Sequence, residues 1–409
     1  MKDITIGVFF GTILHENMGC NALNYSFLQI CKEIGDVKQW NIHYIFYWDI
    51  PQTFNKDNLP IELKQYDINF MKFPDSYIKL FAKGILKDRM RDFNAFFNSI
   101  KKCDLFVDTC GGDSFSDIYG PYTLRYISIC HRTAHFFKKP IVLLPQTIGP
   151  FNTKKGNKIS HFLLKKARNI FVRDLISYNV ALCSAKKEKI IQTIDMAFHM
   201  DYEKRDKIKS ERYAIGISPS ALLWNGGYTG KNELGLREDY KKVIRSIISF
   251  LQEQNCDIYL LAHVLYGSAS KPREDDYWLC KQLHQEYPST ILAPYFYTPM
   301  EAKSFISSLD GLMSSRMHCC IGAYSACIPT FTLGYSRKFN GLFKETLNYN
   351  FGTDLKIDSL KETILKLEFF ISNIPSIKEE MPIRKKTLIL EKEKFIKSLS
   401  YTIESCIEK

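Results

Sequence analysis

The sequence is poor in the features that mark metal-binding, disulfide-stabilised and membrane-spanning proteins. Its twelve cysteines include no CxxC pair and no zinc-like spacing, and no clear cluster of metal ligands is present. Scattered cysteines in a chain of 409 residues are typical of a reducing compartment. No apolar run reaches the ~18 residues that a transmembrane helix needs. We therefore predict a cytoplasmic protein without a metal site.

Residues 4–14 form an apolar stretch that could be mistaken for a signal peptide. Asp3 stands where the basic region of such a peptide would lie, and no small-residue cleavage site follows. A first β-strand that runs into a glycine-containing turn explains the stretch better. We therefore predict no signal peptide.

The chain is basic, with a formal net charge of +12 and a pI near 9.0. This balance favours anionic partners, either a phosphorylated small molecule or an anionic membrane surface contacted peripherally at its inner face. The alternative is that the lysines only keep the surface solvated. The basic residues are spread along the chain without a dense block or a recognisable nucleic-acid motif, so we predict no nucleic-acid partner.

Short apolar runs alternate with amphipathic stretches, which is typical of βαβ units. The length fits two domains, and the charged segment 201–212 lacks periodicity and reads as a linker. We predict an α/β protein with two Rossmann-like domains that face each other across a cleft, at 1–200 and 213–356, followed by a helical, charged segment at 357–409. The predicted strands are 4–10, 40–48, 105–109, 141–144 and 170–172 in the first domain, and 213–217, 258–262, 309–314 and 330–333 in the second.

Polar residues follow the predicted strands of the first domain, where ligands of such sheets bind. Asn17 lies in a turn that could start an anion-binding helix, or could be only an Asn/Gly turn. Asp113 follows two glycines and presents a carboxylate, unless it caps a helix. Gln146 lies in a proline-bounded turn. Arg173 closes a short apolar strand, where it binds an anion or forms a salt bridge to Asp174 or another carboxylate.

The richest segment of the second half joins an apolar strand to an apolar helix at residues 314–320. Arg316 and His318 would lie at the start of this helix, where phosphate and carboxylate groups are favoured. His318 suits proton transfer, or is a hydrogen-bonded structural histidine. Lys338 follows the next strand, where a solvated surface lysine is the alternative. His263 ends another strand and has the weakest indication of a role.

Taken together, these segments resemble the polysaccharide pyruvyl transferase family. The resemblance rests on their order and spacing over about residues 5–350: NxGxxA at 17–22, GGD at 111–113, PQTIGPF at 145–151, FVRD at 171–174, DMAF at 195–198, AHV at 262–264, SSRMHCCIGAYSACIP at 314–329 and GYSRK at 334–338. The RxHxxxxA segment and the lysine about twenty residues later are the most specific parts.

The resemblance implies a fold like that of the two-domain GT-B glycosyltransferases, with the acceptor on the N-terminal domain and the donor on the C-terminal one. It also implies a phosphoenolpyruvate-dependent enzyme that forms a cyclic pyruvate ketal on two hydroxyls of a sugar or lipid-linked oligosaccharide and releases phosphate, without a cofactor. By position, His318 matches the family's proposed general acid. Arg173, Arg316 and Lys338 match cations that hold the donor, and Asn17, Asp113, Gln146 and His263 remain candidates for the acceptor or the cleft.

Two departures from the family pattern concern the acceptor and local geometry. Cys20 stands where many relatives have Asp, and Ile194 replaces a common Pro before Asp195. Two other functions stay open: a GT-B glycosyltransferase that uses a nucleotide sugar, and a carbohydrate-binding protein of the same fold without turnover. Donor preference tests the first alternative, and phosphate release tests the second.

Overall fold

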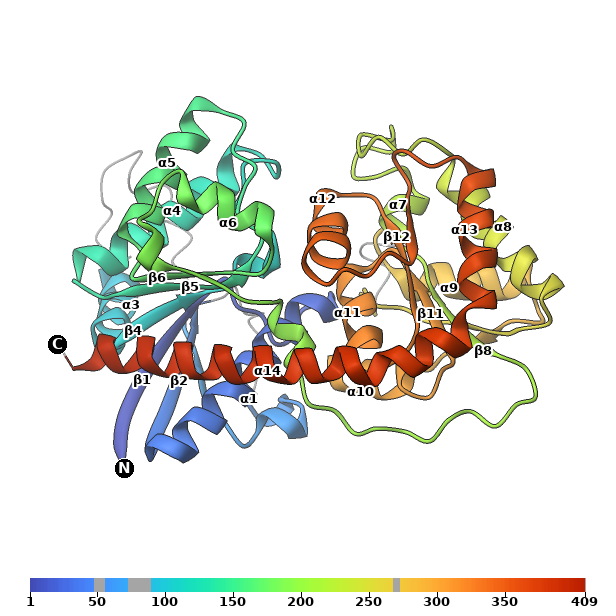
Figure 1. The fold of residues 1–409 in the computed structure, drawn as a ribbon. Coiled ribbons are helices and arrows are strands. Elements are labelled where there is room, and N and C mark those ends of the chain that lie inside the picture. Colours follow the sequence, from blue (N-terminus) through green and yellow to red (C-terminus); the bar gives the residue numbers. More distant parts are fainter. Residues whose placement is uncertain (48–55, 73–89, 268–272, 409) are drawn as a thin grey trace. The chain divides into compact units, whose positions relative to one another are not determined.

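The computed structural model describes residues 1–47, 56–72, 90–267 and 273–408 (Figure 1). The chain forms two compact units. The first unit comprises Met1–Ile13, Leu23–Met196 and Glu391–Lys409, and the second comprises Leu14–Ala22 and Ala197–Leu390.

The first unit contains a sheet of seven parallel strands in the order β3-β2-β1-β4-β5-β6-β7. Each strand predicted in this half is present. The strands are β1 (Lys2–Phe9), β2 (Trp40–Tyr47), β3 (Asp67–Phe70), β4 (Leu105–Asp108), β5 (Ile141–Gln146), β6 (Asn169–Val172) and β7 (Ile190–Gln192).

Helices cover both faces of this sheet because its strands are apolar on both sides, as in β4 with four buried residues. On one face, Phe106 of β4 stacks on Phe9 with ring centroids 4.4 Å apart, in a core shared with Leu124 and Ile127. The other face carries Phe171, which meets Phe395 edge to face at 5.2 Å. The helices are α1 (Met18–Lys38), α3 (Met90–Lys102), α4 (Pro121–Phe136), α5 (Lys154–Lys166), α6 (Leu175–Leu182) and α14 (Ile374–Ile407).

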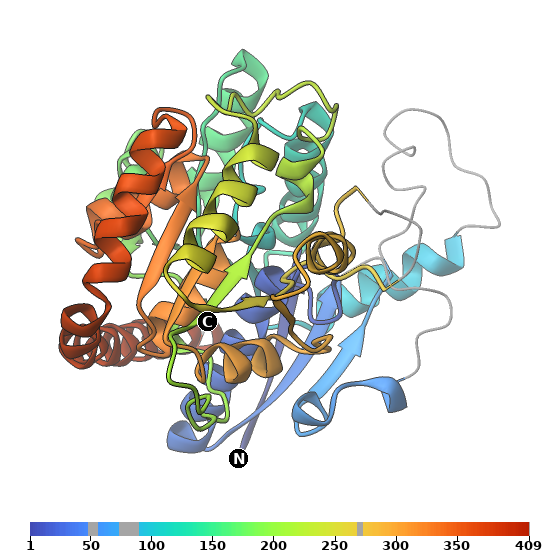
Figure 2. The same cartoon turned by 90° about the vertical axis from the view of Figure 1, so that its right-hand side faces the viewer.

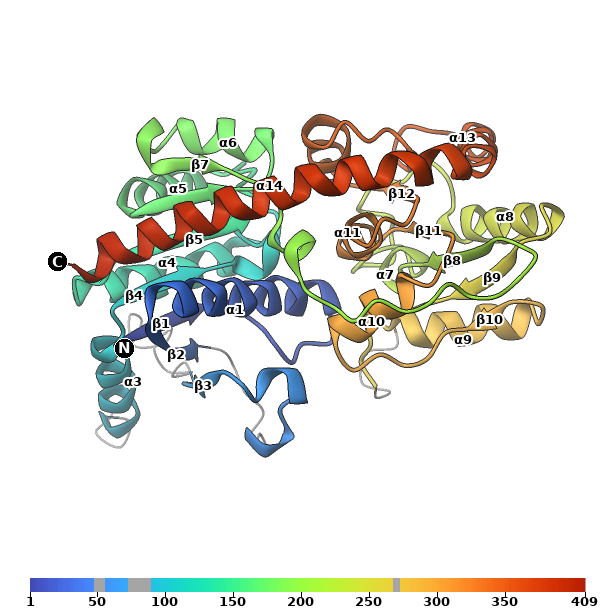
Figure 3. The same cartoon turned by 60° about the horizontal axis from the view of Figure 1, so that its bottom comes forward.

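The end of α14 belongs to the first unit because it packs along α1 there (Figure 3). Lys38 pairs with Glu404 at 2.9 Å, and Lys392 pairs with Glu33 at 2.5 Å. The helical character predicted for 357–409 is therefore observed, but the last nineteen residues form part of the first unit's core layer.

The second unit contains a sheet of six parallel strands in the order β10-β9-β8-β11-β12-β13. Counted from β8, this is the Rossmann order 3-2-1-4-5-6, and the strand order reverses between β8 and β11. The strands are β8 (Ala214–Ser218), β9 (Asp257–Leu260), β10 (Ile291–Leu292), β11 (Gly311–Ser314), β12 (Thr330–Gly334) and β13 (Gly352–Asp354).

The second unit contains an amphipathic helix whose buried residues lie on one face. In α8 (Tyr240–Glu253), Asp239 caps the first turn, and the buried residues recur at helical spacing from Tyr240 to Leu251. α8 packs beside α13 (Leu360–Ser372), as Figure 2 shows. The remaining helices are α7 (Ala221–Trp224), α9 (Asp276–Glu286), α10 (Pro299–Ile306), α11 (Met317–Ser325) and α12 (Arg337–Phe339).

Two parallel α/β sheets of Rossmann type confirm the predicted fold class. Residues 201–212 contain no helix or strand. Within the part of the chain that the structure describes, no helix is both long enough and apolar enough to cross a membrane.

Candidate functional site

The carboxyl edge of the second unit's sheet carries four of the residues singled out from the sequence. His263 follows β9, Arg316 and His318 follow β11, and Lys338 follows β12. β8 and β11 are paired up to Ser218 and Ser314, so the β11 loop opens at the point where the strand order reverses. Ligands of open α/β sheets bind at this point.

Arg316 is held by a carboxylate that the sequence did not point to. Its Nε and Nη2 donate to the two oxygens of Asp276 at 2.9 and 2.6 Å, while Asp276 also accepts the backbone N–H groups of Ala221 and Val264. Although burial acts to lower it, the pKa of Arg316 is raised by the charge of Asp276. The guanidinium is thus a fixed cation, and 13% of its side-chain surface stays exposed.

His318 lies in the first turn of α11 and packs against the first turn of α1. A Cβ placed on Gly19 would lie 2.7 Å from Cγ and 2.8 Å from Cβ of His318, closer than such atoms can approach. Only glycine therefore fits at position 19 while His318 keeps this place. The contact joins the NxGxxA segment to the SSRMH segment within one unit.

His263 lies close enough to His318 and Arg316 to interact with them electrostatically, and it is 5% exposed. Its backbone oxygen accepts the N–H of Met18 at 3.0 Å, and Asn17 forms a β-bridge with Val264. Burial lowers the pKa of His263 to about 3, and electrostatic interactions with His318 and Arg316 add to this effect. His263 is therefore neutral at neutral pH and holds the start of α1 in place through its backbone.

Lys338 lies in the short helix α12 after β12. Its Nζ is 5.9 Å from the ring centroid of Tyr335, the second residue named in the GYSRK segment. Tyr335 also contributes to the electrostatic environment of Arg316. Arg316 and Lys338 therefore share Tyr335 as a neighbour, and they lie at the carboxyl ends of the adjacent strands β11 and β12.

Arg173 belongs to the first unit and is 1% exposed. Its Nη1 forms an ion pair with Asp195, and its Nε and Nη2 donate to the hydroxyl of Thr147 at 3.2 and 2.6 Å. Asp174 instead caps α6 by accepting the N–H of Ser177. A salt bridge to a carboxylate, one of the two sequence interpretations, is therefore present; a donor contact of Arg173 stays a prediction.

The other candidates of the first half each have a local partner. Gln146 is buried at the end of β5, and its Nε2 donates to the oxygen of Asp108 at 2.8 Å. Asp113 accepts the hydroxyl of Tyr119 at 2.9 Å; it does not cap α4, whose N-cap is Gly120. Both contacts suit loops that keep one shape at the strand ends.

Asn17 precedes α1 and accepts the N–H of Gly19 at 2.9 Å through Oδ1. The N–H of Met18 already donates to His263, so the first two amides of α1 have acceptors within the chain. This geometry favours the turn-and-cap interpretation over an anion-binding helix start.

Residues 17–337 match the family model described as polysaccharide pyruvyl transferase. The chain belongs to the polysaccharide pyruvyl transferase family. The match spans every motif from the Asn17 turn to the loop before Lys338, and it confirms the resemblance inferred from the sequence. The amylovoran biosynthesis protein AmsJ of Erwinia amylovora is a relative, 20% identical over 296 residues that cover 70% of each chain.

Solved structures share the fold of this pyruvyl transferase family member at low sequence identity. A UDP-N-acetylglucosamine 2-epimerase of Listeria monocytogenes superposes with a TM-score of 0.55 at 11% identity, over 93% of this chain and 91% of its own. HepE of Anabaena, in complex with UDP and glucose, gives 0.56 at 10% identity over 97% and 99%. The GT-B-like fold class is thereby confirmed.

Sequence reasoning missed the carboxylates that hold the cations of this family member. Asp195 lies in the DMAF segment, so its motif was visible, although its pairing with Arg173 was not. Asp276 ends the run 274–276 of three acidic residues, which reads as a solvated surface. A third pair, Asp108 with His131 at 2.6 Å, is buried and also gave no signal in the sequence. Among the described residues, no group of three or more metal-binding side chains is found.

Proposed function

We propose that this chain transfers the enolpyruvyl group of phosphoenolpyruvate to two hydroxyls of a sugar in a polysaccharide precursor, forming a cyclic ketal. The observation that carries the proposal is the placement of His318 beside Arg316 where the second sheet reverses strand order, with Gly19 packed against His318. Membership of the pyruvyl transferase family and the AmsJ relative support it. Neither a metal nor a cofactor enters the scheme.

In the proposed reaction, His318 donates a proton to the methylene carbon of phosphoenolpyruvate. The adjacent carbon becomes oxocarbenium-like, and the first sugar hydroxyl adds to it. The bond between this carbon and the phosphate oxygen then breaks, and the second sugar hydroxyl adds to the same carbon and closes the ring. Of the two hydroxyl protons released, one returns to His318 and one leaves with phosphate or solvent, so each turnover regenerates the acid.

The donor is a small trianion, and fixed cations stabilise the charge on its departing phosphate. We assign Arg316 and Lys338 to the phosphate and carboxylate of the donor, and Arg173 to a further cationic contact. Asp276 orients Arg316 through a bidentate contact. The planar guanidinium that it fixes has a geometry that suits carboxylate and phosphate ligands. Asn17, Asp113, Gln146 and His263 shape the loops around the donor and acceptor.

Donor preference is the decisive experiment. Thermal unfolding is followed with phosphoenolpyruvate and with UDP-, GDP- and ADP-sugars at equal concentration, because a ligand that binds the native state raises the midpoint. The largest rise is expected with phosphoenolpyruvate. A rise with a nucleotide sugar and none with phosphoenolpyruvate would favour the glycosyltransferase alternative.

Turnover separates an enzyme from a carbohydrate-binding protein. The protein is incubated with phosphoenolpyruvate and a panel of glycosides, and phosphate release and product mass are measured together. We expect one phosphate per product and a mass gain of one pyruvate less one water. Donor binding without phosphate release from any glycoside would count against catalysis.

A further inference from the structure

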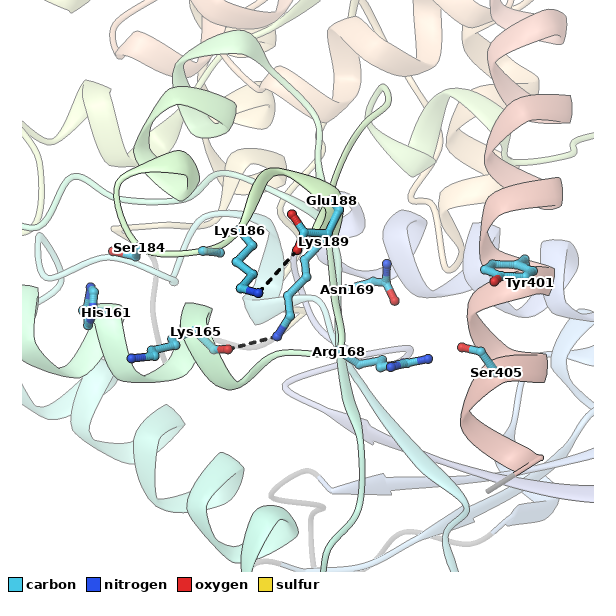
Figure 4. A pocket seen from close by; sticks show the side chains of 11 residues that line it. His161, Lys165, Arg168, Asn169, Ser184, Lys186, Glu188, Lys189, Tyr401 and Ser405 are labelled. Atoms are coloured by element: carbon cyan, nitrogen blue, oxygen red, sulfur yellow. Dashed lines mark hydrogen bonds and ion pairs between the residues drawn. The ribbon is translucent and has the colours of Figure 1, made fainter.

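A concave site lies in the first unit, at the amino ends of β6 and β7, whereas Arg173 follows the carboxyl end of β6. It is a cavity of about 750 Å³ formed by the ends of α5 and α14 and by the segments that precede β6 and β7 (Figure 4). Arg168 and Lys189 come directly before these two strands, so the cavity opens at their amino ends. Its volume is within the range of small-molecule sites.

The cavity is strongly cationic. Four basic side chains line it, and Glu188 is its one carboxylate, so the formal charge of these five residues is +3. Lys186 and Lys189 point into the same space from the segment before β7, while Arg168 extends toward Ser405 of α14 (Figure 4). The fourth cation is Lys165.

Neighbouring cations repel Lys189, and Glu188 offsets this repulsion only in part. Lys186 reaches Glu188 only at 3.8 Å, and both side chains are largely exposed. Lys189 donates to the backbone oxygens of Lys165 and Ala167 at 3.1 and 3.0 Å. Desolvation lowers the pKa of Lys189, and the charge of Arg168 lowers it further. An anionic ligand would relieve this repulsion.

The neutral groups that line the cavity indicate a ligand larger than a simple inorganic anion. Tyr401 is 73% exposed at its rim, and it presents an aromatic ring on which a pyranose can pack. Asn169, Ser184 and Ser405 add amide and hydroxyl groups that suit sugar hydroxyls. Cations, hydroxyl partners and a ring in one cavity of this size match an acidic sugar better than inorganic phosphate.

We propose that the cavity lined by Arg168, Lys186, Lys189 and Tyr401 binds an anionic saccharide, a sugar unit that carries a carboxylate. The choice of a saccharide rests on the proposed function, in which the acceptor is a polysaccharide precursor and the ketal adds a carboxylate to it. The cavity would bind an acidic unit of that chain other than the reacting sugar and so keep a long acceptor bound.

Binding is tested on the full chain without phosphoenolpyruvate, so the result does not depend on catalysis. A disaccharide that ends in glucuronic acid is titrated calorimetrically, beside the same disaccharide ending in glucose, inorganic phosphate and phosphatidylglycerol vesicles. The acidic disaccharide should bind at least about tenfold more tightly than the neutral one, which corresponds to one charge-assisted contact. Lys186→Ser should weaken it about tenfold, and Tyr401→Ser should weaken it as well.

Matched controls use residues of the same type outside the cavity. Lys187→Ser removes the neighbouring exposed lysine, and Tyr122→Ser removes a tyrosine that is 78% exposed on α4. Both should bind the acidic disaccharide like the wild type. Equal losses in Lys187→Ser and Lys186→Ser would overturn the proposal, because general charge would then explain binding.

Two further outcomes would also overturn it. One is equal affinity for inorganic phosphate, which would make the cavity a simple anion site. The other is vesicle binding that depends on Lys186 without any saccharide binding, which would indicate a membrane contact. Pyruvyl transfer to a single small glycoside should be unchanged in Lys186→Ser, so failure of the cavity proposal and failure of the proposed function are distinguishable.

Discussion

Gly19 and His318 are in direct contact, and the contact leaves no space for a side chain at position 19. A Cβ there would lie 2.7 Å from Cγ of the histidine. The glycine lies in the first turn of α1 and the histidine in the first turn of α11, so the contact fixes the starts of the two helices relative to each other. The two residues are 299 positions apart in the sequence.

Gly19→Ala should displace His318 and reduce turnover by up to about 100-fold, because small misplacements of a reacting group are costly. Donor affinity should change less. Gly322→Ala in α11 is the control, since its Cβ would meet nothing nearer than 4.0 Å. That variant should be neutral or slightly more stable. Equal activity of the two alanine variants would show that the contact does not position His318.

His318→Gln should lower turnover by about 10²–10⁴-fold, the usual contribution of a general acid. Folding and donor binding should stay nearly intact, because the cations carry most of the affinity. Steady-state turnover and donor affinity are measured on the same folded preparation. If the variant binds donor poorly but turns over normally at saturation, His318 is a binding residue.

Arg316→Lys keeps the charge but loses the bidentate contact with the buried Asp276. We expect a loss of roughly 1.5–3 kcal/mol in unfolding free energy, measured by denaturant titration, and weaker donor binding. Arg245→Lys is the control, because Arg245 makes a similar two-bond contact with Glu286 on the exposed surface. It should cost no more than about 1 kcal/mol. Similar losses in both variants would argue against a special role of Arg316.

Lys338→Ala should weaken phosphoenolpyruvate binding by about tenfold or more, as expected for one charge-assisted contact. Thermal stability without ligand should change little, because Lys338 is only partly buried. Lys344→Ala, an exposed lysine of the same unit, should bind the donor normally. Unchanged affinity in Lys338→Ala would assign this lysine to the solvated surface.

His263 should make the protein less stable in acid. Its pKa in the folded state is about 3, below the ordinary value of 6.5. Between these two pH values the unfolded chain binds a proton at His263, whereas the native state does not. The contribution of His263 to the free energy of unfolding is fully present above about pH 6.5. It is lost as the pH falls toward about 3, by at most about 1.4 kcal/mol per pH unit. His263→Gln should flatten this slope in denaturant titrations from pH 7 to 4.

His135 provides the comparison for that titration. Burial lowers its pKa to about 4, so its contribution covers a narrower range of pH. His135→Gln should therefore also reduce the acid sensitivity, and the two histidines should differ mainly below about pH 4. Identical pH profiles for the wild type and His263→Gln would contradict the buried, neutral state of His263.

Much of the fold was predictable because local patterns and global structure agree. The run 141–144 was predicted as a strand from its apolar residues alone, and β5 is buried throughout. In α8 the same agreement is seen, because its buried residues recur at helical spacing and Asp239 caps its first turn. Short strands such as β10, with two residues, carry too little pattern to be found in the sequence.

The domain boundaries illustrate what a linear pattern cannot contain. Residues 14–22 follow β1 directly, yet they group with the second unit through Met18, Asn17 and their contacts with 263–264. Residues 391–409 follow the second unit without interruption, yet they pack on β6 and α1 of the first. Each grouping depends on contacts between segments more than 190 residues apart.

The sequence by itself determined the family and the class of fold, and it supplied the candidate side chains for the site, because motifs and periodicity are local properties. Only the tertiary structure decided which charges are compensated. It paired Arg173 with Asp195 and Arg316 with Asp276, and it placed Gly19 against His318. These pairings arise where strands and helices distant in the chain end at the same edge of a sheet, and burial there makes each uncompensated charge costly.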